Sequence, residues 1–288
     1  MRVFLVSFCL LATSLGADEI RVCGSDLLGE SFRRAVQVFA RQNDSTVNLN
    51  LHGTRPGIDD LQAGRADVGL FLLPADEPPP LEQLLSRVVA YQVAVVVVPA
   101  ASPLRQLTLP QLHGLFAPTN GRTAVRWGDL NLSGAWADRP ILLRAVAGKA
   151  GLAYPIFQRV ILAGGEPNAG LEFLGSEDDL AARVAATENA IGLAGLFAAE
   201  PAGLRVLSLA ASPADPAYGP TPENVQQGSY PLRMPLYVTF RREARAGLLL
   251  FLKFLLSDEG AAALAPAHFV PLPTGLRNQL VFELEEMK

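Results

Sequence analysis

The spacing of apolar and polar residues switches repeatedly between the period of a strand and the period of a helix. Glu19 to Cys23 alternates as a strand does, and apolar residues then recur with helical spacing as far as Phe39. The pattern next predicts a strand over Thr46 to Leu51, a helix over Ile58 to Ala63, and a buried strand over Asp67 to Leu73. Strands that alternate with helices predict an α/β fold with a mostly parallel sheet, whose ligands bind at the carboxyl ends of the strands.

Two longer apolar runs predict buried strands. Val88 to Val98 is rich in β-branched residues, and Pro235 to Phe240 is a second long apolar run. The remaining pattern predicts further helices over Leu81 to Leu85, through Phe157 and Leu162, over Leu174 to Ala186 with Ser176 or Glu177 at its start, and over Leu248 to Leu264. It also predicts short strands over Ala190 to Ala194 and over Val206 to Leu209.

The N-terminus predicts export. Met1-Arg2 precedes an apolar run, Val3 to Leu15, which is shorter than the ~20 residues of a membrane-spanning helix. We therefore expect a signal peptide over residues 1–17, cleaved near Gly16-Ala17, and a periplasmic or secreted protein. Cleavage removes one of the two cysteines and leaves Cys23, so no internal disulfide is expected. Cys23 is either a small buried hydrophobe or a reactive thiol.

Composition narrows the class of function. The chain has 288 residues, of which 50% are hydrophobic and 18% charged, with a net charge of −4. This is typical of a globular protein of one large or two ordinary domains, and no basic excess indicates a nucleic-acid partner. A local anion site stays possible, because net charge describes the long-range field and not a pocket of a few donors.

Glycine-containing turns precede three predicted helices, at Gly24-Ser25-Asp26, at His52 to Ile58, and after Arg144. Unpaired N–H groups and the helix dipole attract anions at such helix starts, and an arginine beside the turn adds donors suited to a tetrahedral oxyanion. Ser25 and Asp26 are also good helix caps, so capping and ligand contact are both open for them. Arg55 and Lys149 are either ligand contacts or solvated surface cations.

The inventory of reactive residues does not predict an enzyme. The histidines His52, His113 and His268 are scattered, and neither a Gly-x-Ser-x-Gly nor a His-Glu-x-x-His motif is present. We therefore expect no catalytic residues, no metal and no cofactor.

The order of the motifs resembles the periplasmic phosphate-binding proteins of ABC transporters, which are two-lobed receptors. The motifs that carry the resemblance are Gly24-Ser25-Asp26, Gly53-Thr54 with Gly57-Ile58, Gly64 to Gly69, Trp127 to Leu130, the Arg144 stretch, Asn189 to Gly192, Gly228 to Leu232, Leu256 to Gly260 and Val270 to Pro273. The resemblance implies a type II periplasmic binding protein fold with hinge strands at Val93 to Val98 and Leu236 to Phe240. It implies lobe one from residues 18–93 and 236–288, and lobe two from residues 94–235.

The resemblance also implies a site between the lobes that binds phosphate or a related oxyanion, in a monomer that delivers it to a membrane ABC permease or another envelope protein. The implied ligand residues are Ser25, Asp26, Leu27, Thr54, Arg55, Arg144, Gly148 and Lys149. Thr54 keeps the hydroxyl of the family's serine, and Arg144 matches its phosphate-facing arginine. Leucines stand at the family's polar positions Leu27 and Leu72. The hydroxyls that follow the family's arginine are replaced by Gly148-Lys149-Ala150, or by Ala150-Gly151-Leu152 if two residues are inserted, so the identity of the ligand is left open.

These differences from the family's ligand residues leave two alternative functions. The first is a transport receptor for a small oxyanion. The second is a diverged module that acts as a sensor or protein-interaction domain without phosphate, which an apolar surface around Leu27, Leu72 and Leu152 favours.

Overall fold

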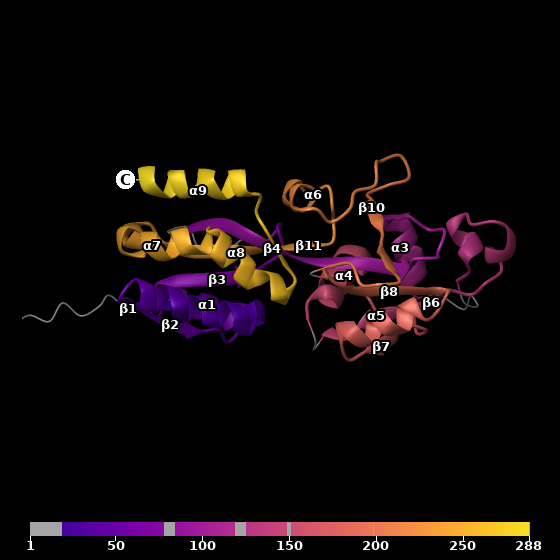
Figure 1. Cartoon of the computed structure of the whole chain (residues 1–288), viewed down its shortest axis with the longest axis horizontal. Helices are drawn as coiled ribbons and strands as arrows, with labels where there is room; N and C mark the ends of the chain where they lie inside the picture. Colours follow the sequence, from indigo (N-terminus) through magenta and orange to yellow (C-terminus); the bar gives the residue numbers. More distant parts are fainter. Residues whose placement is uncertain (1–18, 78–83, 119–124, 149–150, 198, 288) are drawn as a thin grey trace, which may run out of the picture.

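The structure is a computed structural model that describes residues 19–77, 84–118, 125–148, 151–197 and 199–287. Two α/β lobes lie side by side and are joined where β4 (Leu84–Pro99) runs from one to the other (Figure 1). The predicted signal peptide and Lys149 lie outside the described residues. Among the described residues, no helix has the length and apolar character needed to cross a membrane.

Lobe one consists of β1, β2, β3 and β11 with the first half of β4, flanked by helices from both ends of the chain. Its elements are β1 (Glu19–Gly24), η1 (Asp26–Leu28), α1 (Gly29–Gln42), β2 (Thr46–Asn50), α2 (Thr54–Gln62), β3 (Val68–Leu72), β11 (Arg233–Arg241), η5 (Arg242–Ala244), α7 (Arg245–Leu255), α8 (Asp258–Leu264), η6 (Ala265–Ala267), β12 (Phe269–Pro271) and α9 (Thr274–Glu286).

Lobe two is built on β6, β7 and β8 with the second half of β4. Its elements are β5 (Gln106–Thr108), α3 (Leu109–Phe116), η2 (Trp127–Leu130), η3 (Gly134–Trp136), β6 (Leu142–Val146), α4 (Ala153–Leu162), β7 (Glu172–Leu174), α5 (Glu177–Ala185), β8 (Ala190–Gly195), β9 (Leu204–Val206), β10 (Ser208–Ala210) and α6 (Pro222–Gln227).

The strand order β2-β1-β3-β11-β4-β8-β6-β7 makes the sheet mixed rather than mostly parallel. Pairs β1–β2, β1–β3, β6–β7 and β6–β8 are parallel, as the alternation of strands and helices predicts. Strand β11 runs antiparallel to β3 and β4, and β4 runs antiparallel to β8. Of these strands, β4 carries the chain from lobe one to lobe two. The two-lobed α/β class is confirmed.

Strand directions bring the carboxyl ends of both lobes' parallel strands toward each other. Both β3 and β4 are antiparallel to β11, so β3 and its parallel neighbour β1 run, like β4, toward lobe two. Strand β8 is antiparallel to β4, so β8 and its parallel neighbour β6 run toward lobe one. The helix starts that follow β1, β2 and β6 therefore lie at facing edges, where α/β sheets place their ligands.

The chain passes between the lobes over fewer residues than the resemblance implies. Val93 pairs with Arg233 of β11, whereas Ala94 onward pairs with β8, so β4 passes between the lobes at these two residues. The chain returns at Leu232, whose carbonyl accepts from the Ala94 N–H at 3.0 Å. Residues Leu236 to Phe240 pair with β3 and lie inside the sheet of lobe one, so they are not the returning hinge.

Each lobe has a hydrophobic core of its own. One cluster of buried residues contains Val22, Phe32 and Phe251 in lobe one, and another contains Trp127 and Phe157 in lobe two. Leu152, Met234 and Leu280 are partly buried and pack against both clusters. The cluster of lobe two also contains Tyr91, Val270 and Leu272 from the lobe-one side of the junction, so apolar packing continues from one lobe to the other. Leu152 lies immediately before α4 and packs against the lobe-one core.

Three predicted elements differ in the structure. Leu84 and Leu85 belong to β4 and not to a helix, while 81–83 lie outside the described residues. The helix predicted over Leu248 to Leu264 is two helices, because the Ser257 hydroxyl caps Gly260 N at 3.1 Å and starts α8. The strand predicted over Val206 to Leu209 is divided between β9 and β10.

A buried tyrosine, Tyr230, stabilises the place where the chain passes between the lobes, and this gives a first prediction. The Tyr230 side chain is fully buried and its hydroxyl donates to the Ala94 carbonyl at 2.9 Å. Tyr230→Phe leaves that carbonyl without its partner, so we expect the free energy of unfolding to fall by about 1–3 kcal/mol. Urea denaturation measures it, with Tyr218→Phe, at a half-buried tyrosine, as the control. Equal losses in the two variants would contradict this role of Tyr230.

Candidate functional site

The first turn of the candidate site follows β1 in lobe one. The Ser25 N–H donates to the Leu70 carbonyl at 2.9 Å, and the Ser25 hydroxyl accepts from Leu27 N at 3.2 Å. Ser25 is 2% exposed, so of the two roles open for it the structure shows helix capping. The neighbouring Asp26 is exposed, and Leu27 packs partly buried against the lobe-one core. The Leu27 N–H is thus occupied by the cap.

The second turn begins α2, at the carboxyl end of β2. The Gly53 N–H donates to the Gly24 carbonyl at 2.9 Å, which joins this turn to the first. The Thr54 hydroxyl oxygen accepts from Leu72 N at 3.1 Å, at the end of β3. A hydroxyl that accepts one hydrogen bond keeps its own hydrogen for donation. Thr54 and Arg55 begin the helix, so their N–H groups have no intrahelical acceptor.

Two of the leucines that the resemblance places at polar family positions, Leu72 and Leu152, lie in different surroundings. Leu72 is 7% exposed and belongs to the lobe-one core, so its side chain is not a free surface of the site. Leu152, immediately before α4, is partly buried and contacts the cores of both lobes. An apolar side chain therefore bridges the facing edges, where the resemblance implies hydroxyls.

Lobe two contributes the turn between β6 and α4. Gly148 is exposed in this turn, and Lys149 lies outside the described residues. The helix α4 starts at Ala153, and its first N–H groups likewise have no intrahelical acceptor. The start of α4 thus offers backbone donors at the edge that faces lobe one.

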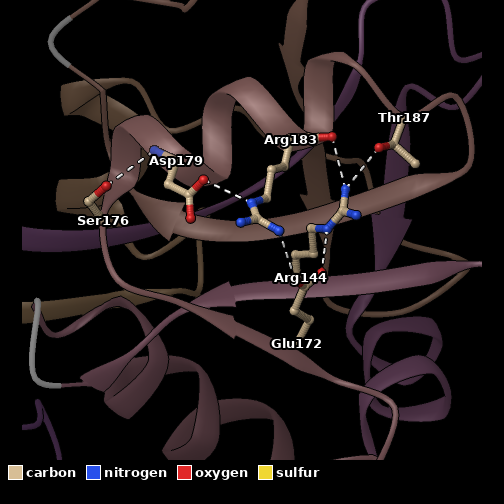
Figure 2. Close-up of polar contacts among 6 residues, drawn as sticks. All are labelled: Arg144, Glu172, Ser176, Asp179, Arg183 and Thr187. Atoms are coloured by element: carbon tan, nitrogen blue, oxygen red, sulfur yellow. Dashed lines mark hydrogen bonds and ion pairs between the residues drawn. The ribbon is translucent and has the colours of Figure 1, made fainter.

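Arg144 lies in the middle of β6 rather than at the end of the strand, because β6 continues to Val146. Figure 2 shows its guanidinium turned toward β7 and α5. The Nε atom donates to Glu172 Oε2 at 2.8 Å, and Nη1 donates to the Arg183 carbonyl at 2.9 Å and to Thr187 Oγ1 at 3.0 Å. The side chain is only 13% exposed. It holds the C-terminal end of α5 to the sheet, a position that suits a cation.

The contacts around Arg144 form a network along α5. Glu172 also pairs with Arg183 at 3.1 Å, Arg183 pairs with Asp179 at 2.8 Å, and Ser176 caps the helix through Asp179 N (Figure 2). The predicted cap Ser176 is thereby confirmed. This network accounts for Arg144 without a ligand.

Cys23 is not a reactive thiol in this fold. It is buried, its Sγ lies 3.1 Å from the Gly57 carbonyl, and burial raises the pKa of the thiol to about 12. The thiol is therefore protonated at neutral pH, which leaves Cys23 as a small core residue.

Two polar residues near the lobe junction carry no signal in the sequence beyond a helix start and an isolated histidine. Glu177 is the first residue of α5, and its Oε1 accepts from Gly195 N at 2.9 Å, at the end of β8. His268 comes from the C-terminal segment of lobe one, and its Nδ1 lies 2.7 Å from the Leu196 carbonyl. Only the fold brings these residues together.

Comparison with known proteins supports this architecture. A family model described as "PBP superfamily domain" matches residues 12–259, so the chain belongs to the PBP superfamily. The phosphate-binding protein PstS of Pseudomonas aeruginosa is 26% identical over 204 residues, which are 68% of this chain and 62% of that protein. The match thus spans less than two thirds of the length of that relative.

Solved structures share the fold over almost the whole chain. A possible phosphate-binding protein from Planctomyces limnophilus has a TM-score of 0.72 at 21% identity, covering 94% of this chain and 99% of its own. An ABC-type phosphate transport receptor from Vibrio cholerae has a TM-score of 0.67 at 18% identity, covering 88% and 100%. PstS from Borrelia burgdorferi has a TM-score of 0.72 at 17% identity, covering 89% and 99%.

Proposed function

We propose that this chain is an exported solute receptor that binds phosphate or a related small oxyanion between its lobes and presents it to a membrane ABC permease. The observation that carries the proposal is the direction of the strands, which sets the starts of α2 and α4 at facing edges. Family membership and the phosphate-binding relatives support it. Binding without chemistry is proposed, in line with these relatives.

The proposed ligand contacts are the N–H groups of Thr54 and Arg55, the Thr54 hydroxyl, and the backbone of the Gly148 turn with the start of α4. Helix starts of this kind bind anions through unpaired N–H groups and the helix dipole. We leave Arg144 out of this set because its donors are engaged on β7 and α5. We leave out Ser25 because it is 2% exposed, and Leu27 because its N–H donates to the Ser25 hydroxyl. The charge of Asp26, exposed beside the first turn, opposes a highly charged ligand.

Thr54 gives the sharpest test of this ligand set. Thr54→Val keeps the shape but removes the hydroxyl, so a charge-assisted hydrogen bond worth about 1.5–3 kcal/mol is lost and the affinity for the anion falls roughly ten- to hundredfold. Thr54→Ser keeps the hydroxyl and serves as the matched control, with an affinity close to that of the unaltered protein.

The measurement is isothermal titration with phosphate, sulfate, molybdate and small carboxylates. Heat-silent titrations of the unaltered protein with all of these would contradict the receptor and favour the interaction module. Equal affinity of Thr54→Val and Thr54→Ser would keep the receptor but remove Thr54 from the site.

A further inference from the structure

A pocket with a volume of about 170 Å³ lies between the two lobes. Its lining comes from the loop after β3 in lobe one, from α4 in lobe two, and from the stretch where the chain returns to lobe one. The apolar members of this lining are Pro74, Ala75, Ile156, Val160, Pro231 and Met234. Each lobe therefore contributes a wall, and α4 lies beside the place where β4 passes between the lobes (Figure 1).

The pocket begins close to the groups that are proposed to bind the anion. Ile156 follows Ala153 by three residues of α4, which is about 5 Å along the helix axis. Pro74 follows Leu72 by two residues of extended chain, about 7 Å, and the Leu72 N–H donates to the Thr54 hydroxyl. A substituent of a few carbons on an anion at the starts of α2 and α4 therefore reaches the pocket lining.

Val160 gives the pocket an exposed apolar surface. Its side chain is 39% exposed, although most of the large apolar side chains in the described part of the chain are buried. A ligand group that covers Val160 removes this surface from water, which favours binding. Small-molecule sites typically combine an apolar lining of this kind with a few polar groups.

The charged side chains at the pocket are already paired. Arg159 Nη2 donates to Asp76 Oδ2 at 3.0 Å and to Glu77 Oε1 at 2.9 Å, so Arg159 joins α4 to the loop after β3. Arg233 donates to the Gln226 carbonyl at 2.8 Å, at the end of α6. The two arginines and the two carboxylates together carry no net charge. The pocket therefore suits a neutral apolar group better than a second charged group.

The ion pair between Arg159 and Asp76 closes the outer side of the pocket. Both residues also line a wider hollow of about 430 Å³, which includes Gln158 and Gly164. Among the described lining residues, the two cavities share this pair and no other residue. The pair therefore limits how far a ligand group extends from the anion.

We propose that this pocket is a subsite for an apolar substituent on the bound anion. The ligand is then a tetrahedral phosphorus oxyanion that carries one apolar group of up to about six carbons, since an apolar cavity of about 150 Å³ holds a benzene molecule. The inference rests on the proposed function, because the anionic end of such a ligand occupies the contacts at Thr54 and the start of α4. The substituent covers Val160 and replaces water in the pocket.

The experiment is isothermal titration with inorganic phosphate and with methyl-, propyl- and octylphosphonate. Each methylene that enters the pocket is expected to raise the affinity about fourfold, so propylphosphonate should bind roughly tenfold more tightly than methylphosphonate. Octylphosphonate is too long for the pocket, so its affinity should fall below that of propylphosphonate.

Two variants test where the substituent lies. Val160→Phe fills the pocket, so it should lose the preference for propylphosphonate over methylphosphonate and keep its affinity for inorganic phosphate. Val38→Phe is the matched control, at a valine of α1 that is 40% exposed, and it should keep the preference. Arg159→Ala removes the outer limit, so octylphosphonate should bind this variant at least as tightly as propylphosphonate does.

The possible results separate the subsite from the receptor itself. Phosphate binding together with equal or falling affinity from methyl- to propylphosphonate would overturn the subsite and keep the receptor. A preference for propylphosphonate that survives in Val160→Phe would also overturn it, because the substituent then lies elsewhere. If Val160→Phe does not fold, as judged by circular dichroism, Arg159→Ala decides, and an unchanged order of affinities overturns the subsite. Titrations without heat for every ligand would contradict both proposals.

Discussion

Gly24→Ala is expected to cause the largest loss of stability of any substitution at the candidate site. A Cβ atom at this position would lie 2.1 Å from the Leu70 carbonyl oxygen, and the backbone has φ +143°, which L-residues rarely adopt. Backbone cannot move aside as a side chain does, so overpacking adds to the conformational strain. We expect the free energy of unfolding to fall by about 4 kcal/mol or more.

The matched control is Gly64→Ala, where φ is also positive, at +72°, but where nothing lies within 4 Å of the added Cβ. Gly64→Ala therefore lowers the free energy of unfolding only by the conformational cost of the positive φ, about 1 kcal/mol. Urea denaturation followed by tryptophan fluorescence compares the two variants. If Gly24→Ala costs no more than Gly64→Ala, the contact between the first turn and β3 is not as close as described.

Arg144→Ala is expected to destabilise the protein while leaving anion affinity nearly unchanged, the reverse of what its resemblance to the family's arginine implies. Its largely buried guanidinium makes one hydrogen bond to β7, one to the end of α5 and one to Thr187 just after α5. Their loss leaves the Arg183 carbonyl and the Thr187 hydroxyl without this donor. We expect a fall in the free energy of unfolding of about 2 kcal/mol, discounted because Glu172 is partly exposed.

Two measurements on the same variant separate the two roles of Arg144. Denaturation gives the stability, and phosphate titration gives the affinity. Arg183→Ala, in the same network but at a side chain that is 50% exposed, should cost clearly less stability. A stable Arg144→Ala protein that no longer binds phosphate would contradict the structural role and return Arg144 to the ligand set.

Much of the fold follows from the sequence because its causes are local. Alternation over Glu19 to Cys23 and the apolar run after Val88 predict strands that the structure contains, and Ser176 predicts the start of α5. The order of these elements also resembles that of the family, which is why the two-lobed class is predicted correctly. Caps, periodicity and turn residues act within a few positions, so a single chain reveals them.

The site is less predictable because it depends on the residue at which each strand ends and on the direction in which each side chain points. A strand that continues two residues past Arg144 puts the guanidinium beside α5, and no apolar pattern fixes that end. Similarly, Leu236 to Phe240 read as a crossing strand, yet their partner is β3. The contact of His268 Nδ1 with the Leu196 carbonyl joins distant parts of the chain, and only the packed structure reveals it.

The most direct measurement of the central claim is a crystal structure of the protein grown with phosphate. We expect tetrahedral density between the lobes, within hydrogen-bond distance of the Thr54 hydroxyl and the backbone at the start of α4, with Arg144 still paired to Glu172. Density that lies against the Arg144 guanidinium, or no density between the lobes at saturating phosphate, would contradict it.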